Sequence, residues 1–270
     1  MHVTVVCALT AEARPFIRRW QLARIAASPF QLLATRQRRV IVSGLGVHAC
    51  ATAVGYAAAN EAPDAHHLWV NFGIAGHAAS ALGHTVVATR VRHVQARDAW
   101  YPSLLVEPAW PGGEVLTHDQ PVLDYPDRQY CDMEASAFMA AASRVAPLDL
   151  VQVVKVVSDN REHGPQAVHA PLIERLVEAQ LGAFDDWIER WQACVGALPQ
   201  ARADAVRDEL LARWRYTHAE RTQLTQLCAR WRLLGTPQVS AELAACRDAQ
   251  ALLACLRAIV DALPLRLPAT

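Results

Sequence analysis

The sequence of 270 residues predicts an α/β fold with three layers, in which a mostly parallel or mixed central sheet is flanked by helices. Two observations lead to this class. Short β-branched runs alternate with helix-like stretches over the first two-thirds of the chain, and several of the runs are continuously apolar, as in strands covered on both faces. From Pro165 onward the pattern is helical. We therefore expect an α/β domain over residues 1–198 and a helical C-terminal extension over residues 199–270.

Five β-branched runs are predicted to be the strands of the sheet. They cover residues 3–9, 39–46, 68–76, 84–94 and 150–160. Helix-like segments lie between them, at residues 11–20, 47–60 and 133–146. This alternation is typical of βαβ units with a largely parallel sheet.

Residues 95–131 interrupt the alternation. Five prolines and two adjacent glycines predict loops around at most one short strand, near residues 114–117. Further on, residues 174–198 form a long amphipathic segment that places Trp187 and Trp191 on one helix face. Three or four more helices are expected after Pro199.

Polar or glycine residues follow several of the predicted strands. Glu12, the segment Ser43–Gly46, the segment Asn71–Gly73 and the pair Ser158 and Asp159 each come directly after an apolar run. Ligands of open α/β sheets bind outside the carboxyl ends of the strands. These four segments are therefore expected to border one crevice.

The stretch CDMEASAF, residues 131–138, places two carboxylates at the start of a predicted helix. An acidic side chain there can accept hydrogen bonds from the exposed backbone N–H groups and meets the positive end of the helix dipole. We assign this capping role to Asp132. Glu134 is a candidate for both capping and ligand binding.

The composition argues against several classes of function. Lys and Arg together number 26, as do Asp and Glu, so the charge balance gives no reason to expect nucleic acid or an anionic membrane as partner. No apolar run reaches the length of a bilayer span, and the first residues lack the pattern of a signal peptide. Seven cysteines without a CxxC pair fit reduced thiols, so we expect a cytoplasmic protein. No HExxH pattern occurs, and neither a metal nor another cofactor is predicted.

Five motifs in order carry a resemblance to a known family. ALTAEARPF, VSGLGVHACATA, NFGIAG, CDMEASAF and VKVVSDN occur at suitable spacing within residues 2–195. Together they resemble the purine nucleoside phosphorylase and nucleosidase superfamily, and most of all the methylthioadenosine/S-adenosylhomocysteine nucleosidases. The resemblance implies cleavage of the N-glycosidic bond of an adenosine-type nucleoside, which can carry a modified 5′ position. The resemblance implies nothing about residues 199–270, which have no counterpart in the small nucleosidases.

The resemblance also implies roles for individual residues. Glu12 matches the glutamate that activates the attacking water, and Asp159 matches the aspartate that protonates N7 of the departing purine. Met133 and Glu134 match the ribose contacts. The further substrate-binding candidates are Ser158, Gly44, Gly73 and Lys155, the only lysine of the chain.

The chemistry requires these residue types for a reason that does not depend on the family. A glycosidic bond breaks through an oxocarbenium-like transition state, so one acid must protonate the leaving group and one base must activate a water on the other face. Nearby carboxylates stabilise the positive charge that the sugar gains.

Departures from the family pattern leave the base site open. Ile74 stands where the nucleosidases usually have serine, and Lys155 stands where an arginine is common. The segment THDQPV, residues 117–122, takes the place of the base-facing segment, and we expect Gln120–Val122 to line the base.

Three functions remain open at this point. The first is hydrolysis of a purine nucleoside. The second is phosphorolysis on the same scaffold, with an anion site formed by the backbone of Ser43–Gly46 and by Arg90 or Arg92. The third is a protein that binds a nucleoside or a partner without turnover. In each case we expect a nucleoside ligand and a homodimer.

Overall fold

A computed structural model describes residues 1–60, 67–197, 205–234 and 238–263. The chain divides into two compact units, Met1–Ala197 and Leu198–Thr270, and each is described here by itself. The predicted boundary between residues 198 and 199 falls in a segment outside the described residues.

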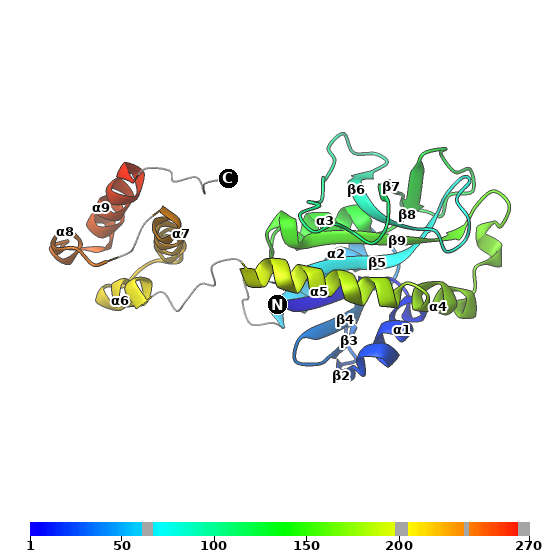
Figure 1. The fold of residues 1–270 in the computed structure, drawn as a ribbon, viewed down its shortest axis with the longest axis horizontal. Coiled ribbons are helices and arrows are strands. Elements are labelled where there is room, and N and C mark those ends of the chain that lie inside the picture. The colour runs from blue at the N-terminus through cyan, green and yellow to red at the C-terminus, as the bar shows by residue number, and fades with distance from the viewer. Residues whose placement is uncertain (61–66, 198–204, 235–237, 264–270) are drawn as a thin grey trace. The chain divides into compact units, whose positions relative to one another are not determined.

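The strands of the first unit form one nine-stranded sheet in its described part (Figure 1). Their bounds are β1 (His2–Cys7), β2 (Ala23–Ala26), β3 (Gln31–Ala34), β4 (Arg38–Val42), β5 (His67–Gly76), β6 (Thr85–His93), β7 (Gly112–Thr117), β8 (Gln129–Asp132) and β9 (Val151–Asp159). β1 pairs in parallel with β4 and β5, and β5 pairs in parallel with β9. β6 runs antiparallel to β9, and β3 runs antiparallel to β2 and β4, so the sheet is mixed.

β5 holds a special place in the sheet because it has three neighbours. It pairs with β1, with β9 and, through Gly76 and Cys131, with the end of β8. The order β5-β8-β7-β6-β9 therefore closes on β5, while β1, β4, β3 and β2 extend from it as an open sheet. Nine of the ten residues of β5 are buried, and Ile74 is partly buried, which explains the largely apolar sequence of this strand.

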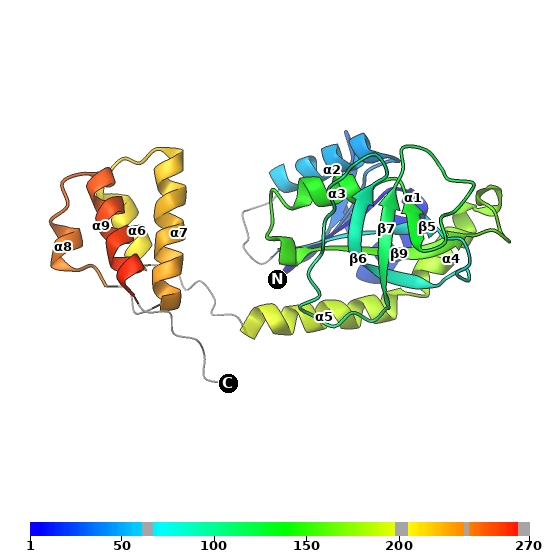
Figure 2. The ribbon, with the colours of Figure 1, turned by 90° about the horizontal axis from the view of Figure 1, so that it is seen from above.

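Helices cover both faces of this sheet, which confirms the predicted three-layer class (Figure 2). α1 (Thr10–Trp20), α4 (Ala170–Glu178) and α5 (Leu181–Ala197) pack on one face, and α2 (Val47–Ala59) and α3 (Ala135–Ala142) pack on the other. Short 3-10 turns lie at Leu148–Leu150 and Pro165–Ala167.

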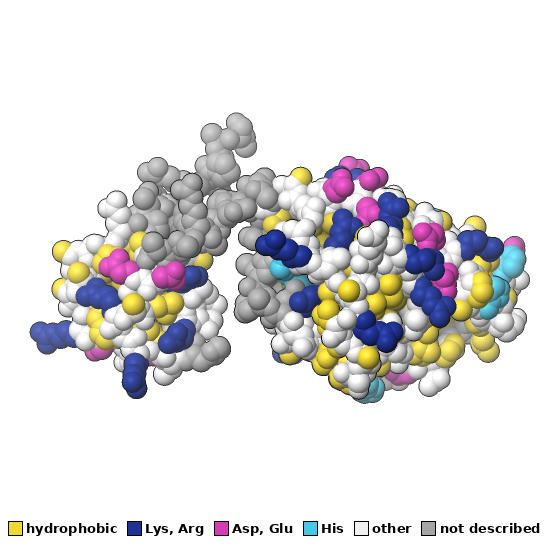
Figure 3. All heavy atoms as spheres, turned by 90° about the horizontal axis from the view of Figure 1, so that it is seen from below, with side chains coloured by type: hydrophobic (Ala, Val, Ile, Leu, Met, Phe, Trp, Pro, Cys, Tyr) yellow, Lys and Arg dark blue, Asp and Glu magenta, His cyan; other side chains and the backbone are white. Residues whose placement is uncertain are grey.

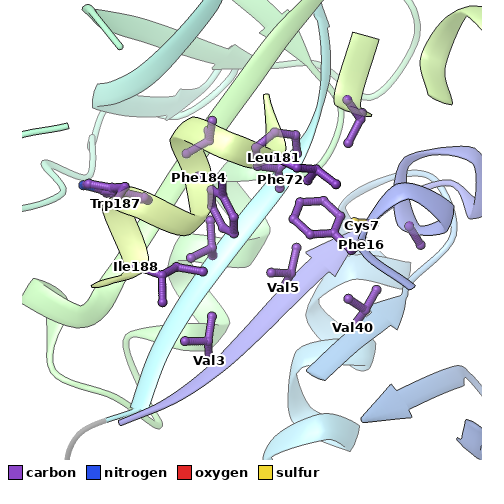
Figure 4. Close-up of a cluster of buried hydrophobic side chains, with 14 of the residues drawn as sticks. Val3, Val5, Cys7, Phe16, Val40, Phe72, Leu181, Phe184, Trp187 and Ile188 are labelled. Carbon is purple, nitrogen blue, oxygen red and sulfur yellow. The ribbon is translucent and has the colours of Figure 1, made fainter. Parts of the chain in front are cut away.

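Aromatic side chains fill the core beneath α1 and α5 (Figure 4). The ring of Phe16 lies 5.1 Å from that of Phe72 and 5.4 Å from that of Phe184, centroid to centroid. Trp187 and Trp191 are both buried on the same side of α5, as their spacing predicts. Each fully buried apolar side chain of this size contributes about 1.5–3 kcal/mol, so this cluster fixes α5 on the sheet.

Two parts of the unit differ from the sequence prediction. The long segment expected over residues 174–198 is divided between α4 and α5, which pack in the same core, and Trp110 Nε1 donates a hydrogen bond to Gln180 Oε1 at 3.0 Å between them. The proline-rich stretch contains two strands rather than one, since β8 adds to β7 in parallel. Tertiary pairing, which local sequence does not encode, accounts for this second strand.

The second unit is helical in its described residues. It contains α6 (Ala205–Arg213), α7 (His218–Leu234), α8 (Ala241–Ala244) and α9 (Ala249–Ala262). Its core is separate and consists of the fully buried Leu210, Leu224, Leu243, Leu252 and Leu256 with their neighbours. The Asp248 carboxylate accepts a hydrogen bond from Ala251 N at 2.8 Å and caps α9.

Charges of both signs are interspersed on the face of each unit that Figure 3 shows. On the first unit, ion pairs join α1 to α4, with Arg14 and Arg18 bonded to Glu174 at 2.7 and 2.9 Å. Within the described residues, no helix is both long and apolar enough to cross a bilayer.

Candidate active site

A cavity of about 630 Å³ opens where β1, β5, β8 and β9 end. Five predicted site residues, distant in sequence, line it together: Glu12, Met133, Glu134, Ser158 and Asp159. The predicted base segment Gln120–Val122 also lines it. Of the four segments expected to border one crevice, Glu12 and the pair Ser158 and Asp159 line this cavity. The segment Ser43–Gly46 contributes Leu45 alone, and the segment Asn71–Gly73 does not line it.

A larger depression of about 860 Å³ lies elsewhere on the same unit. Its lining includes Arg19, Arg38 and Asp185, which pair with one another, and none of the predicted site residues. The smaller cavity, which the predicted acidic residues line, is therefore the candidate site.

Glu12 is the third residue of α1, directly after β1. Its Oε2 accepts a hydrogen bond from Leu9 N at 2.9 Å, as in a capping box, and its Oε1 accepts one from Ile74 N at 2.9 Å. The side chain is buried, and this burial raises the pKa of the carboxyl above its ordinary range, although the backbone N–H groups and Lys155 oppose the shift. Glu12 is consequently a fixed carboxyl with enhanced basicity at the cavity wall.

Gly73 supports Glu12 rather than lining the cavity. A Cβ atom on Gly73 would lie 2.8 Å from Glu12 Oε1, closer than real Cβ atoms come to a neighbouring atom. The absence of a side chain at this position therefore makes room for the carboxylate.

Asp132 caps the helix that follows it, as the sequence predicts. Its Oδ2 accepts hydrogen bonds from Glu134 N at 3.2 Å and Ala135 N at 2.7 Å, where α3 begins. Its Oδ1 accepts a third hydrogen bond from Thr117 Oγ1 at 2.7 Å. Asp132 therefore fixes the backbone that presents Glu134 to the cavity.

Lys155 lies beneath the cavity and is not among the residues that line it. Its Nζ is 2.8 Å from Asp132 Oδ2, and the lysine side chain is only 1 % exposed. Burial lowers the pKa of Lys155, but the carboxylates of Asp132, Glu134 and Glu12 outweigh this effect and leave the pKa raised. The geometry thus gives Lys155 a contact with Asp132 instead of the direct substrate contact that we expected.

Glu134 meets the glycine loop that follows β4. Its Oε1 accepts a hydrogen bond from Gly46 N at 2.7 Å, and Gly46 adopts a φ of 93°, which favours glycine. Burial raises the pKa of Glu134 to about 7; the charges of Asp132 and Glu12 add to this rise, while Lys155 and the Gly46 N–H oppose it. The predicted binding residue Gly44 does not line the cavity, and its N–H bonds Ala8 O at 3.1 Å.

Asp159 ends β9 with a carboxylate held by two hydroxyl groups. Ser158 Oγ donates a hydrogen bond to Oδ1, and the Tyr125 hydroxyl donates one to Oδ2. Burial and the bond to Asp159 raise the pKa of Tyr125 above its ordinary range, so the phenol stays protonated. Sequence reasoning missed Tyr125, because it lies in the irregular stretch between β7 and β8, where no periodic pattern marks it.

Carboxylates dominate the ionisable lining of the cavity. Within the described residues, neither lysine nor arginine lines it, and His169 uses its Nδ1 to accept a hydrogen bond from Leu172 N at 3.3 Å at the start of α4. Arg90 pairs with Glu114 at 2.9 Å, outside the cavity. The described part of the chain contains no group of three or more His, Cys, Asp or Glu side chains that could hold a metal ion.

Comparisons with known proteins give matches only among solved structures. No family model matches the chain, and no curated protein sequence matches it. The apo 5′-methylthioadenosine nucleosidase of Arabidopsis thaliana superposes with a TM-score of 0.58 at 18 % identity, covering 70 % of this chain and 95 % of that one. The MTA/SAH nucleosidase of Streptococcus pneumoniae in complex with 8-aminoadenine gives a TM-score of 0.56 at 18 % identity, covering 70 % and 100 %.

A third similar structure is a variant of Helicobacter pylori MTAN with 5′-methylthioadenosine in its active site. It gives a TM-score of 0.56 at 12 % identity and covers 70 % of this chain and 98 % of that one. At such identities the likeness is one of fold. The described α/β unit therefore has the nucleoside phosphorylase-like fold of the MTA/SAH nucleosidases.

Proposed function

We propose that this protein hydrolyses the N-glycosidic bond of an adenosine-type purine nucleoside. The observation that carries the proposal is the convergence of Glu12, Glu134 and Asp159 on one cavity of nucleoside size. The solved structures with this fold are nucleosidases of 5′-modified adenosines, which supports the same reaction.

Asp159 and Glu12 supply the two proton transfers. Asp159 gives a proton to N7 of the base as the bond between C1′ and N9 breaks. Glu12 accepts a proton from the water whose oxygen bonds to C1′. Each transfer of this kind contributes about 10²–10⁴-fold to the rate. The raised pKa of Glu12 makes it a better base near neutral pH.

Glu134 and Met133 contact the ribose in this proposal. Glu134 has one oxygen bonded to Gly46 N, and its remaining lone pairs can accept hydrogen bonds from sugar hydroxyls. Its negative charge also stabilises the oxocarbenium character of the sugar in the transition state.

Water is favoured over phosphate as the attacking group by the charges around the cavity. Phosphate sites use arginine, lysine and backbone N–H groups. Gly46 N is bonded to Glu134, Gly44 N is bonded to Ala8 O, and the Lys155 ammonium is bonded to Asp132. An anion would thus meet four carboxyl groups, with these donors already engaged.

The test is a panel of nucleosides, scored by free base with and without phosphate. Adenosine, 5′-methylthioadenosine and inosine form the panel, and the sugar product is analysed as ribose or ribose 1-phosphate. We expect base release that is independent of phosphate. Base release that requires phosphate would establish phosphorolysis instead, and nucleoside binding without product would support the non-enzymatic alternative.

Variants of the two acids test their roles. Glu12→Gln and Asp159→Asn should each lower kcat by about 10²–10⁴-fold. Glu189→Gln and Asp98→Asn change exposed acids outside the cavity in the same way, and they should leave the rate unchanged. If both cavity variants release base as fast as wild type, the assigned roles are wrong.

The homodimer and the cytoplasmic location remain part of the proposal. Tyr101, Leu104 and Leu105 stand exposed on one loop, which supports a protein contact there. No disulfide joins any of the seven cysteines, all of which lie among the described residues, and this supports a reducing compartment. Light scattering after size-exclusion chromatography measures the oligomeric state.

A further inference from the structure

Tyr125 occupies the leaving-base end of the cavity, beside the proposed acid. Its hydroxyl donates to Asp159 Oδ2, and its ring lines the cavity while being almost fully buried. None of the roles proposed above uses this residue.

The position of Tyr125 is fixed by its surroundings. The ring lies directly over Gly76, where a Cβ atom would collide with it and would also come within 2.8 Å of Asp159 Oδ2. Arg161 Nη2 donates a hydrogen bond to Tyr125 O at 3.1 Å and pairs with Asp127 at 2.9 Å. The ring also packs with Ala78 and Cys131. These contacts hold the Tyr125 side chain in place within the site.

The two hydroxyl groups at this end of the cavity already use their hydrogen atoms in hydrogen bonds to Asp159. A hydroxyl group has one donor and two acceptor lone pairs. Tyr125 and Ser158 both give their hydrogen atoms to Asp159, one to each carboxyl oxygen. Toward a bound base, both hydroxyl groups therefore present only lone pairs.

A purine that takes a proton on N7 presents one particular edge to Asp159. N7 shares this edge with the substituent on C6, which is an amino donor in adenine and a carbonyl acceptor in 6-oxopurines. When N7 faces Asp159, the Tyr125 hydroxyl, which bonds the same carboxyl and lines the cavity, is the group placed to meet that substituent. An amino group can donate to the free lone pair of the Tyr125 oxygen, whereas a carbonyl finds no hydrogen atom there.

We propose that Tyr125 is the residue that selects a 6-amino over a 6-oxo purine, through a hydroxyl group whose own hydrogen is held by Asp159. This inference rests on the proposed function, since it assumes that Asp159 faces N7. It assigns base selection to a side chain on the segment between β7 and β8. Tyr125 also positions Asp159, and this second effect acts on all substrates alike.

The test compares Tyr125→Phe with wild type on adenosine and inosine. Loss of the Asp159 contact should lower kcat for both nucleosides. The preference for adenosine over inosine in kcat/KM should fall by about tenfold in addition, the factor that one neutral hydrogen bond contributes. Tyr130→Phe is the matched control, because Tyr130 is also buried, bonds Ser80 Oγ and does not line the cavity. The preference of Tyr130→Phe for adenosine over inosine should equal that of wild type.

Two further measurements make the result independent of a single variant. Wild type should cleave purine riboside and N6,N6-dimethyladenosine less well than adenosine, because neither offers an N–H at C6. Equilibrium dialysis with free adenine and free hypoxanthine measures base binding without turnover. Wild type should prefer adenine, and Tyr125→Phe should lose that preference while circular dichroism shows it folded.

The outcomes separate this inference from the proposed function. If wild type cleaves no nucleoside, the proposed function fails, and dialysis alone decides whether Tyr125 selects the base. An unchanged preference in Tyr125→Phe, in kinetics or in dialysis, overturns the inference. A variant that cleaves both nucleosides faster by the same factor also overturns it, because the hydroxyl would then obstruct the base.

Discussion

The ammonium of Lys155 lies 2.8 Å from Oδ2 of Asp132, and both side chains are almost completely buried. This ion pair sits under the cavity and holds the carboxylate that caps α3. A buried charge that loses its partner is strongly unfavourable, whereas an exposed pair contributes little.

Replacing Lys155 by methionine should therefore lower the free energy of unfolding of residues 1–197 by about 3–5 kcal/mol. Hydrogen exchange of peptides from β9 in a urea series measures the change. Arg18→Met is the control, since Arg18 is 54 % exposed in its pairs with Glu174 and Glu178, and it should cost about 1 kcal/mol or less. Equal effects of the two substitutions would contradict a stabilising role of the buried pair.

Gly73→Ala should displace the Glu12 carboxylate, because the new Cβ would stand 2.8 Å from Oε1. A misplacement of about 1 Å costs on the order of 10²-fold in rate, so base release should fall by at least this factor. Gly55→Ala is the matched control: a Cβ on this helical glycine meets nothing within 4 Å. It should keep full activity and gain about 0.5–1 kcal/mol of stability. Unimpaired activity of Gly73→Ala would argue against Glu12 as the base.

The stability of the first unit should depend on pH through Glu134. Its pKa is about 7 in the folded chain and 4.5 ordinarily, so between these values the folded state retains a proton that the unfolded state releases. The stabilisation is complete below pH 4.5 and is lost as the pH rises through about 7. The free energy of unfolding of wild type should thus decline relative to Glu134→Gln from about pH 5 to about pH 8. A constant difference between the two proteins over this range would show that the Glu134 pKa is not raised.

Leu252→Ala should destabilise the C-terminal unit by about 2–5 kcal/mol, because Leu252 is fully buried in the core of that unit. Hydrogen exchange should increase in peptides from α7 and α9, while β5 in the first unit keeps its protection. Leu123→Ala removes a leucine that is 77 % exposed and should change stability by about 0.5 kcal/mol or less. Loss of protection in β5 would mean that the two units unfold together.

The placement of Glu12 and Asp159 could be predicted because both follow apolar runs that read as buried strands. In a parallel sheet the ends of such strands meet at one edge, so local sequence is enough to bring distant residues together. Glu134 was found differently, as an acidic residue at the start of a predicted helix within a motif that resembles the family. All five predicted strands appear in the structure within a few residues of their expected bounds.

The partner of Lys155 and the role of Tyr125 could not be predicted in this way. The Lys155–Asp132 pair depends on β5 lying between β8 and β9, which is a matter of tertiary pairing. Tyr125 lies among prolines, where neither helical nor strand periodicity indicates which way a side chain points. The short strands β2 and β3 were missed for a similar reason, since each has only four residues.

β5 also sets the spacing between the two carboxyl groups that we propose for the proton transfers. Ile74 N bonds Glu12, and Gly76 lies under Tyr125 and Asp159, so the proposed base and the proposed acid are anchored two residues apart on one strand. A strand rises about 3.3 Å per residue, so this interval is set by covalent geometry at about 7 Å. Changes in the loops around the cavity should therefore leave the spacing between these two carboxyl groups unaltered.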